Sequence, residues 1–538
     1  MLQTQPPFRT LGTMLDCSRN AVPNMASLKK WIDWTSKFGY NMLMLYTEDT
    51  YELADNPYYG YMRGRFSNDE LREADRYARS RGMALIPCIQ VLAHLMQIKR
   101  WAEYRPHFDT HDILLVGDER VYALIDSMFE TLAECFTSRV AHIGMDEAHM
   151  LGRGRALDLH GDKDRTALML EHLRRVCTIG EKHGFRFLMW SDMFFRLAAG
   201  GDYYASDVNV SDELRAMIPD NVELVYWDYY HTQKRDYDAM LEAHERMHPG
   251  AWFAGGLWTW TGFAPHNGFS IDATRAAVAS CRERGVKDMF FTLWGDDGGE
   301  CSRFALLPAL YYAAALARGE TDMAAIRAGF ETLTGAPFDG FMALDLPGTR
   351  NAEAGGTCNQ EKYLLYNDCF LGQLDPNVPA GCGGQYAACA QRLEELSEMP
   401  KWGYLFKTLA ALCRVLEIKA ELGIRTHEVY FSKDADALRA LIGDYRELSR
   451  RLERFHAAFQ DQWFMDNKPH GFDVQDIRLG GLMRRVESCR ARLEALLDGR
   501  VDKIEELEER QLDYCEGRGA KQPPVFDNWK EIVTANVV

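Results

Sequence analysis

Between residues 9 and 318, eight short apolar runs rich in β-branched and aromatic residues alternate with longer segments of helical periodicity. The runs have the length and composition of buried strands, and the intervening segments are long enough to cross between parallel strands. Eight β/α units in about 310 residues are typical of an α/β protein with a closed (β/α)8 TIM barrel. The predicted strands are Arg9–Asp16, Asn41–Tyr46, Ala84–Ile89, Ala141–Met145, Phe185–Trp190, Glu223–Trp227, Trp252–Gly256 and Met289–Trp294. The predicted helices include Ala26–Phe38, Asp69–Arg81, Val121–Thr137, Thr166–His183 and Ala273–Arg284.

The chain changes character after residue 340, where strand-like runs give way to segments rich in Leu, Glu and Arg. Apolar residues then recur at steps of three and four, as in Leu482, Val486, Cys489 and Leu493, which predicts long helices with one apolar face. We therefore expect a TIM-barrel domain over residues 1–340 and an α-helical C-terminal domain over residues 341–538, joined through an irregular segment at 351–384. A helical bundle is favoured over a dedicated dimerisation coil, and a homodimer stays open.

The charge balance and the cysteines narrow the class of protein. The chain has 62 Lys and Arg against 79 Asp and Glu, a net charge of −17 at pH 7, which argues against nucleic acid or an anionic membrane as partner. Its 13 cysteines include no CxxC pair, and the first residues lack a signal-peptide pattern. The longest nearly uncharged apolar run, Phe304–Ala317, is too short to span a bilayer. We therefore expect a cytoplasmic protein.

The residues that follow the predicted strands are strongly non-random. Catalytic residues of barrel enzymes lie at the carboxyl ends of the strands, and here those positions are rich in carboxylates and aromatic rings. Aromatic faces stack on the C–H faces of a pyranose, and carboxylates and Arg bind its hydroxyls, so the set favours a sugar pocket. Its members are Asp16, Arg19, Glu48, Asp49, His94, Asp146, Glu147, Trp190, Asp192, Trp227, Tyr229, Tyr230, Trp258, Trp294 and Asp296.

The adjacent pair Asp146 and Glu147, after the predicted fourth strand, carries the clearest chemical signal. Neighbouring residues on a strand point to opposite faces, so both can face a pocket only from a turn at the strand end. Two carboxylates that flank a glycosidic bond stand about 5–5.5 Å apart in retaining enzymes and about 6.5–9.5 Å apart in inverting ones, which does not suit an adjacent pair. The pair fits another division of labour, in which one residue is the general acid/base and the other holds a nucleophile that belongs to the substrate.

These residues resemble the motifs of glycoside hydrolase family 20, the β-N-acetylhexosaminidases, over the whole predicted barrel. The family's fourth strand reads His-x-Gly-x-Asp-Glu, which corresponds to His142–Glu147, and its first reads Leu-Asp-x-Ser-Arg, which corresponds to Leu15–Arg19. The resemblance implies that Glu147 protonates the leaving oxygen and later activates water. It also implies that Asp146 orients the 2-acetamido group of the sugar and stabilises an oxazolinium charge.

The same resemblance implies the rest of the sugar pocket. Arg19 is expected to bind sugar hydroxyls with Asp49 as its partner, and Asp296 to contact the outer hydroxyls. The family's strand-seven tyrosine, which hydrogen-bonds the acetamido oxygen, corresponds to a position on or near Trp258. The Trp258 indole N–H could donate this hydrogen bond, or Tyr229 or Tyr230 could donate it instead. The implied substrate-binding residues are Arg19, Asp49, His94, His142, Trp190, Trp227, Tyr229, Trp258, Trp294 and Asp296.

The function implied by the resemblance is an exo-acting retaining β-N-acetylhexosaminidase that hydrolyses terminal β-linked GlcNAc, GalNAc or both, from small oligosaccharides or glycoconjugates, through an oxazolinium intermediate. It implies no cofactor and no metal. The string His244–His248 matches the HExxH zinc pattern, but we interpret it as the solvated end of a crossover helix. Two alternatives stay open: a glycosidase of the same barrel for another 2-substituted sugar, and a sugar-binding protein without turnover.

Overall fold

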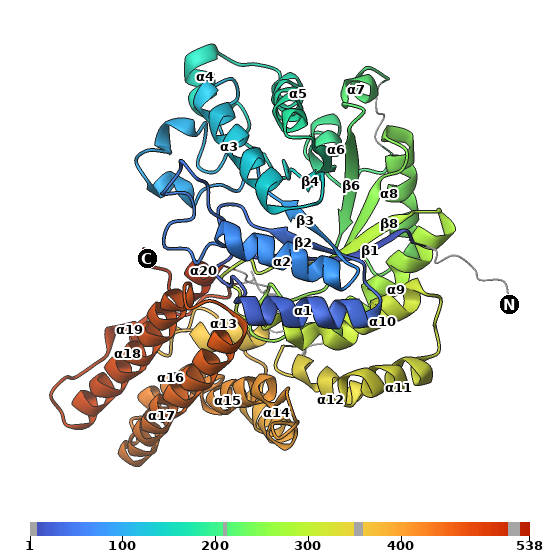
Figure 1. The fold of residues 1–538 in the computed structure, drawn as a ribbon. Helices are drawn as coiled ribbons and strands as arrows, with labels where there is room; N and C mark the ends of the chain where they lie inside the picture. Colours follow the sequence, from blue (N-terminus) through green and yellow to red (C-terminus); the bar gives the residue numbers. More distant parts are fainter. Residues whose placement is uncertain (1–7, 208–211, 349–358, 515–527) are drawn as a thin grey trace. The chain divides into compact units, whose positions relative to one another are not determined.

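The computed structural model describes residues 8–207, 212–348, 359–514 and 528–538 of the chain. Eight parallel strands are hydrogen-bonded in sequence order, and β8 pairs with β1 to close the barrel (Figure 1). The predicted (β/α)8 barrel is therefore confirmed. The strands are β1 (Thr10–Asp16), β2 (Met42–Tyr46), β3 (Ala84–Cys88), β4 (Val140–His142), β5 (Arg186–Trp190), β6 (Val222–Asp228), β7 (Trp252–Gly256) and β8 (Asp288–Leu293).

Burial on both faces explains the apolar character of the strands. All five residues of β2 are buried, and so are all six of β8. The parallel register pairs Gly12 of β1 with Met42 of β2, and at the closure Thr10 of β1 lies opposite Asp288 of β8. Since side chains fill the inside of a barrel and helices cover its outside, both faces of each strand favour apolar residues.

The predicted crossover helices surround the strands (Figure 1). Four of the five form within two residues of their predicted ends, whereas the helix predicted at Ala273–Arg284 already begins at Asn267. Side-chain caps mark the starts of the first two: Asn24 accepts the Ser27 N–H before α1, and Ser67 and Glu70 form a capping box at α2. The helices up to residue 334 are α1 (Met25–Phe38), α2 (Asn68–Ser80), α3 (Glu119–Cys135), α4 (Arg155–His160), α5 (Arg165–Lys182), α6 (Asp192–Ala198), α7 (Asp212–Met217), α8 (Lys234–Met247), α9 (Asn267–Glu283), α10 (Leu307–Ala317) and α11 (Met323–Thr334).

The fourth strand is shorter than predicted. It ends at His142 and not at Met145, because Gly144 and Met145 both have positive φ angles, 69° and 68°, which a strand cannot continue through. Asp146 and Glu147 therefore lie on a turn beyond the strand and not at its last position.

By its internal contacts the chain forms two compact units. The first comprises residues 1–257, 270–294 and 310–326, and the second comprises residues 258–269, 295–309 and 327–538. The segments that directly follow β7 and β8 thus belong to the second unit, although both strands belong to the barrel. The predicted domain boundary at residue 340 stays a prediction, since this division does not correspond to a single cut in the chain.

The second unit is helical, in agreement with the predicted class of the C-terminal region. Helix α14 packs on α15, α15 on α17, and α17 on α18. The segment 351–384, predicted to be irregular, contains α13 and the start of α14, where that prediction is wrong, whereas residues 367–381 between the two helices form turns and one short 3-10 helix. Residues 349–358 lie outside the described residues. The helices are α12 (Phe338–Met342), α13 (Gln360–Tyr366), α14 (Cys382–Leu396), α15 (Gly403–Lys419), α16 (Leu422–Ser432), α17 (Ala435–Asp466), α18 (Phe472–Leu497), α19 (Glu505–Glu508) and α20 (Trp529–Val533).

A buried ion network joins the segment after β8 to two helices of the second unit. Lys362 Nζ of α13 lies 2.8 Å from Glu300 Oε2 and 3.1 Å from Asp297 Oδ2. Arg478 of α18 lies 2.8 Å from Asp297 Oδ1 and 3.1 Å from Glu300 Oε1. The side chains of Lys362 and Glu300 are only 1% and 2% exposed. Since a buried charge is tolerated only with partners, each of these four groups depends on the others.

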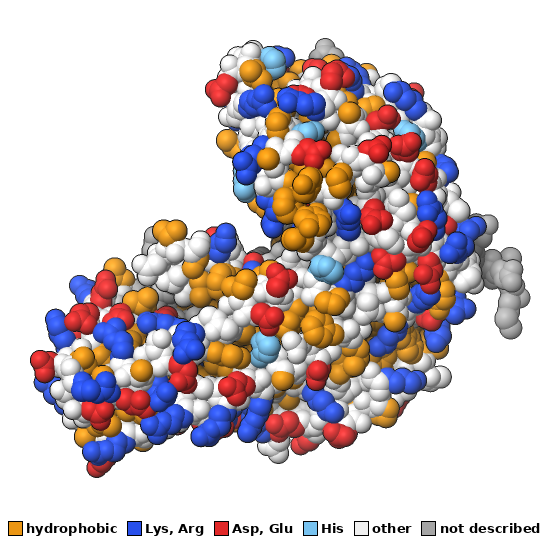
Figure 2. Space-filling view, turned by 60° about the vertical axis from the view of Figure 1, so that its left-hand side comes forward, with side chains coloured by type: hydrophobic (Ala, Val, Ile, Leu, Met, Phe, Trp, Pro, Cys, Tyr) orange, Lys and Arg blue, Asp and Glu red, His pale blue; other side chains and the backbone are white. Residues whose placement is uncertain are grey.

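Three further features concern the surface charges, the apolar character of the helices and the cysteines. On the face drawn in Figure 2, acidic and basic side chains are interspersed. None of the helices in the described ranges combines the length and the apolar character that crossing a bilayer demands. The 11 cysteines in those ranges are free thiols and are buried.

Candidate active site

Turns that follow β2, β3 and β4 carry residues in the left-handed backbone region. They are Glu48 with φ 44°, His94 with φ 60°, Met145 with φ 68° and Glu147 with φ 51°. A residue other than glycine rarely adopts this conformation, and such strained residues cluster at functional sites. The conformation allows neighbouring side chains to point in the same direction, which a regular strand does not. Because Asp146 and Glu147 lie on the turn after β4 and not on a strand, their side chains need not point to opposite faces. Both can therefore face the same pocket.

Gln90, just beyond β3, fixes the turn after β4. Its Oε1 accepts a hydrogen bond from the Met145 N–H at 3.1 Å, and its Nε2 donates to Asp146 Oδ1 at 2.6 Å and to Tyr46 Oη at 3.0 Å. A Cβ atom at Gly144 would lie 2.2 Å from Gln90 Oε1, so this close approach requires glycine. Gln90 thus gives Asp146 a hydrogen-bond donor.

His94 lies beside both carboxylates. Its Nε2 is 3.3 Å from Asp146 Oδ2 and 3.9 Å from Glu147 Oε2. Burial by itself lowers the pKa of His94, but the charge and hydrogen bond of Asp146, with the charge of Glu48, raise that pKa to about 9. Burial likewise opposes ionisation of Asp146, yet His94 and Gln90 together hold the pKa of Asp146 below its usual range. The pair is therefore an imidazolium beside a carboxylate at neutral pH.

The same three side chains could geometrically approach one metal ion. His94, Asp146 and Glu147 each offer a ligand atom, and these atoms lie within 4.8 Å of one another. A metal requires a neutral imidazole, whereas Asp146 keeps His94 protonated. The arrangement favours a charged hydrogen-bond donor over a metal ligand.

Glu147 is held through its backbone and not through its carboxylate. Its N–H donates to Asp192 Oδ2 at 3.0 Å, and Arg196 Nη2 lies 4.0 Å from Glu147 Oε1. Arg196 Nε also donates to Asp192 Oδ2, at 3.3 Å. Burial, together with the charges of Asp146 and Glu147, raises the pKa of Asp192 to about 7, although the hydrogen bond from the Glu147 N–H and the charge of Arg196 oppose this rise. The Glu147 side chain itself is 41% exposed, so it faces open space.

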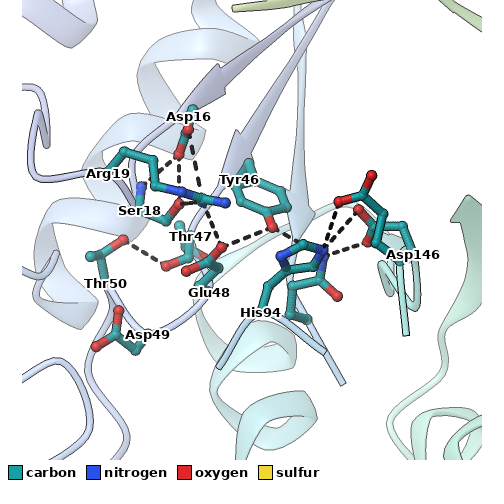
Figure 3. Close-up of polar contacts among 12 residues, drawn as sticks. Asp16, Ser18, Arg19, Tyr46, Thr47, Glu48, Asp49, Thr50, His94 and Asp146 are labelled. Carbon is teal, nitrogen blue, oxygen red and sulfur yellow. Dashed lines mark hydrogen bonds and ion pairs between the residues drawn. The ribbon is translucent and has the colours of Figure 1, made fainter. Parts of the chain in front are cut away.

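Arg19 is paired with Glu48, and the predicted pairing with Asp49 is wrong. Arg19 Nη1 donates to Glu48 Oε1 at 2.6 Å, and Tyr46 Oη donates to the same oxygen at 3.0 Å (Figure 3). The left-handed conformation of Glu48 turns its carboxylate toward Arg19. Asp49 points away from Arg19 and pairs with Arg63, whose Nη2 lies 3.1 Å from Asp49 Oδ1. Arg19 keeps a 25% exposed side chain, which leaves part of the guanidinium accessible.

Four of the predicted aromatic residues form one continuous wall in the barrel unit. Trp227 stacks on Tyr229 with ring centroids 5.2 Å apart, and Tyr229 is hydrogen-bonded to Trp294. The ring centroid of Trp294 lies 6.3 Å from that of Trp190 and 4.7 Å from that of Tyr46. Since Tyr46 is also bonded to Glu48 and Gln90, the wall and the charged groups share one polar network.

Two predicted binding residues lie in the second unit. Trp258, two residues after β7, is buried and stacks on Trp260 with centroids 4.2 Å apart. Asp296, three residues after β8, is exposed. The segment that carries Trp258 is held inside its own unit by Glu361, whose Oε1 accepts the N–H groups of Phe263 and Ala264. The roles proposed for Trp258 and Asp296 stay predictions.

Three of the predicted binding residues have a buried polar atom with no hydrogen-bond partner among the described residues. They are His94 Nε2, which lies 3.3 Å from the Asp146 carboxylate as an ion pair, His142 Nε2 and Trp190 Nε1, and the rings of His142 and Trp190 lie 4.4 Å apart. Burial lowers the pKa of His142 to about 3, so His142 is neutral. Unpaired buried polar groups are rare in folded proteins, and those in an active site are available to a ligand.

The HExxH segment is correctly placed on the outer helix α8, but the expectation that it is solvated is wrong for His244. That side chain is 1% exposed, and its Nε2 lies 2.8 Å from Ser191 Oγ while its Nδ1 lies 2.7 Å from the Met240 carbonyl. Nε2 thus connects the helix to Ser191 after β5, whereas Nδ1 bonds the preceding turn of the same helix.

Several residues that build the site have no role in the sequence prediction. Glu48 and Asp192 stand out in the sequence as carboxylates after strands, but nothing there says which groups they meet. Tyr46 ends a predicted strand and Gln90 follows another, but neither residue type marks its position as part of a site. Arg196 stands four residues after Asp192 on α6, a spacing that places two side chains on one helix face and could have indicated the pair.

We predict that His94 titrates near pH 9 and that Asp146→Asn lowers its pKa by roughly 1–3 units, because the amide removes the negative charge that stabilises the imidazolium. An unfolded His titrates near 6.5, so this stabilisation is complete below about pH 6.5 and is lost as the pH rises to about 9. NMR titration of labelled histidines, with His94→Gln to assign the signal, measures the pKa directly.

Chemical unfolding between pH 6 and 9 checks the same linkage. The free energy of unfolding is expected to fall with pH by on the order of 1–3 kcal/mol more in the wild type than in His94→Gln. His183→Gln, at an outer ion pair with Asp126, is the matched control and should keep the wild-type slope. A His94 signal that titrates below pH 7 would contradict the assignment of a charged pair.

The comparisons with known proteins agree with the site's motifs. The family model for the glycosyl hydrolase family 20 catalytic domain matches residues 7–242, and the model for the glycoside hydrolase 20C C-terminal domain matches residues 339–525. Among curated proteins, the β-hexosaminidases of Porphyromonas gingivalis and Vibrio furnissii are each 24% identical to this chain, over 229 and 184 residues. These matches cover 36% and 27% of this chain and 29% and 30% of those proteins, so the chain spans less than a third of their length.

One solved structure is similar to this chain over a larger share of both chains. The β-N-acetylhexosaminidase from Bacteroides fragilis has 19% sequence identity with this chain and a TM-score of 0.46, over 61% of this chain and 70% of that one. With a catalytic-domain model and a C-terminal-domain model of the same family matched in order along one chain, the protein belongs to glycoside hydrolase family 20.

Proposed function

We propose that the protein is an exo-acting retaining β-N-acetylhexosaminidase that removes terminal β-linked GlcNAc or GalNAc from small oligosaccharides or glycoconjugates. The observation that carries the proposal is the unequal environment of two adjacent carboxylates. Asp146 is buried between Gln90 and His94, whereas Glu147 is 41% exposed and its carboxylate accepts no hydrogen bond from the described residues. One carboxylate is thus fixed in position and charged, and the other is open to the leaving group.

In the proposed reaction Glu147 donates its proton to the glycosidic oxygen while the bond from that oxygen to C1 breaks. The acetamido oxygen of the substrate attacks C1 from the other face and forms the oxazolinium ion, whose charge Asp146 stabilises while it accepts the acetamido N–H. Glu147 then removes a proton from the water that attacks C1, so the product keeps the β configuration. An acetamido oxygen held beside C1 acts at high effective molarity, which replaces a protein nucleophile.

The remaining groups supply sugar binding in this proposal. Arg19, fixed by Glu48, donates to the sugar hydroxyls, and the neutral His142 and Trp190 offer unpaired buried nitrogens. The aromatic wall of Trp227, Tyr229 and Trp294 provides faces for the C–H groups of the pyranose. The proposed enzyme uses no metal or cofactor, and its buried free thiols support the expectation of a reducing, cytoplasmic location.

The test is the release of nitrophenol from four substrates at matched concentrations near pH 6: the β-N-acetylglucosaminide, the β-N-acetylgalactosaminide, the plain β-glucoside and the plain β-galactoside. We expect turnover confined to the two N-acetyl sugars, because only they carry the proposed nucleophile. Turnover on the plain glycosides would mean a protein nucleophile and would overturn the mechanism. Sugar binding by calorimetry without hydrolysis of any of the four would indicate a sugar-binding protein instead.

A further inference from the structure

A cavity of about 610 Å³ opens in the barrel unit beside the general acid proposed above. It lies among the turn after β4, the start of α5 and the helix α6, all within residues 149–201. Its charged lining residues are Arg153, Asp162, Lys163, Asp164, Arg165 and Arg196. No step of the proposed reaction uses this space.

The lining carries more positive than negative charge in a chain of net charge −17. Four Lys and Arg side chains face two Asp side chains in it. Asp162 Oδ1 lies 2.9 Å from Arg153 Nη1 and neutralises that one cation, whereas Asp164 Oδ1 accepts the Ala167 N–H as the N-cap of α5. Lys163 forms no ion pair with any other described residue, and its side chain is exposed. The cavity therefore has positive charge that its own wall does not neutralise.

The cavity begins where a leaving group would emerge. His149 stands two residues after Glu147, and its N–H donates to the Glu147 carbonyl at 2.6 Å. Arg196 lies on the lining and also 4.0 Å from Glu147 Oε1, so it connects the cavity wall to the carboxylate that would protonate the glycosidic oxygen. A group carried by the sugar or aglycone on the leaving side would enter this space.

We propose that this cavity is a leaving-group subsite for an anion, a carboxylate or a sulfate, carried by the unit from which the N-acetylhexosamine is released. The inference rests on the proposed function and adds the substrate class to it. Arg and Lys bind such anions through charge-assisted hydrogen bonds, and Lys163 and Arg153 are exposed residues of the lining, so a charged group can reach them without desolvation of the whole substrate.

The experiment compares kcat/KM for three aryl N-acetyl-β-glucosaminides: 4-nitrophenyl, 3-carboxy-4-nitrophenyl and the corresponding sulfonate. The two anionic glycosides are expected to be better substrates by roughly 3- to 10-fold at about 20 mM ionic strength, and this preference should shrink at about 300 mM because exposed charge pairs are screened. The two anionic arms show whether carboxylate or sulfate geometry fits better. Free inorganic sulfate should inhibit hydrolysis of the anionic glycosides more than that of the neutral one.

Lys163→Gln and Arg153→Gln separate the subsite from the reaction. Each is expected to remove most of the preference for the anionic glycosides and to leave kcat/KM for the neutral one unchanged. Lys182→Gln, at the other end of α5 and outside the lining, is the matched control and should keep the wild-type ratio. Equal kcat/KM for neutral and anionic glycosides, or an unchanged ratio in Lys163→Gln, would overturn the subsite while leaving the proposed function intact. Failure to hydrolyse any of the three would overturn the proposed function, and the subsite with it.

Discussion

Replacing Glu147 with Gln is expected to lower kcat on an N-acetylglucosaminide with a poor leaving group by about 10²- to 10⁴-fold, the usual contribution of a positioned general acid. Gln keeps the size of the side chain and the backbone hydrogen bond to Asp192, which comes from the Glu147 N–H. It cannot, however, donate the proton that the departing oxygen needs. The measurement is steady-state hydrolysis of a disaccharide beside a dinitrophenyl glycoside, on both enzymes.

The pattern across substrates identifies the role of Glu147. A dinitrophenolate leaves without protonation, so the first step on that glycoside should lose far less in Glu147→Gln than the same step on a disaccharide. Glu171→Gln, on the exposed side of α5, should match the wild type on both substrates. Full turnover of the disaccharide by Glu147→Gln would show that another residue is the acid.

The barrel fold can be predicted from the sequence because it depends on the hydrophobic pattern of many residues, and no single residue decides it. Eight buried strands leave eight apolar runs, and β7 was predicted with its observed ends, Trp252–Gly256. The motif that carries the family resemblance could likewise be recognised, since it is continuous in the sequence from His142 to Glu147. What fails at β4 is local: Gly144 makes a left-handed turn plausible, but nothing in the sequence requires Met145 to adopt one, and the contact of Gly144 with Gln90 that enforces the turn is between distant segments.

The pairing of Arg19 shows that a sequence motif can indicate a charged residue without indicating which partner it binds. Glu48 and Asp49 are adjacent carboxylates after the same strand, and either could meet a cation from β1. The choice depends on one backbone angle, the φ of 44° at Glu48, and on Arg63, which binds Asp49 from 14 residues further along the chain. Neither the angle nor the competing Arg can be recognised from residue types and spacing, because each follows from the complete packing of the turn.

The ion network of the second unit also joins residues that are distant in the sequence. Removing one of its charges is expected to cause the largest loss of stability. Replacing Lys362 with Met is expected to lower the free energy of unfolding by roughly 3–5 kcal/mol, because it leaves buried carboxylates without one of their two cations. Although burial lowers the pKa of Lys362, the charges of Glu300 and Asp297 raise it above its ordinary value, so the ammonium is charged in the folded protein. Met fills a similar volume, which limits the contribution of a cavity to the loss.

Urea unfolding of the full chain, followed by a probe of the second unit, measures this loss, and a double variant separates charge from packing. Adding Glu300→Gln to Lys362→Met removes the uncompensated charge and should recover part of the stability, whereas a pure packing defect would be deepened by a second substitution. Lys407→Met, at an exposed ion pair with Glu398 in the same unit, is the control and should change stability by less than about 0.5 kcal/mol. A loss for Lys362→Met no larger than that of this control would mean that Arg478 alone neutralises both carboxylates, and the four charges would then not form one interdependent network.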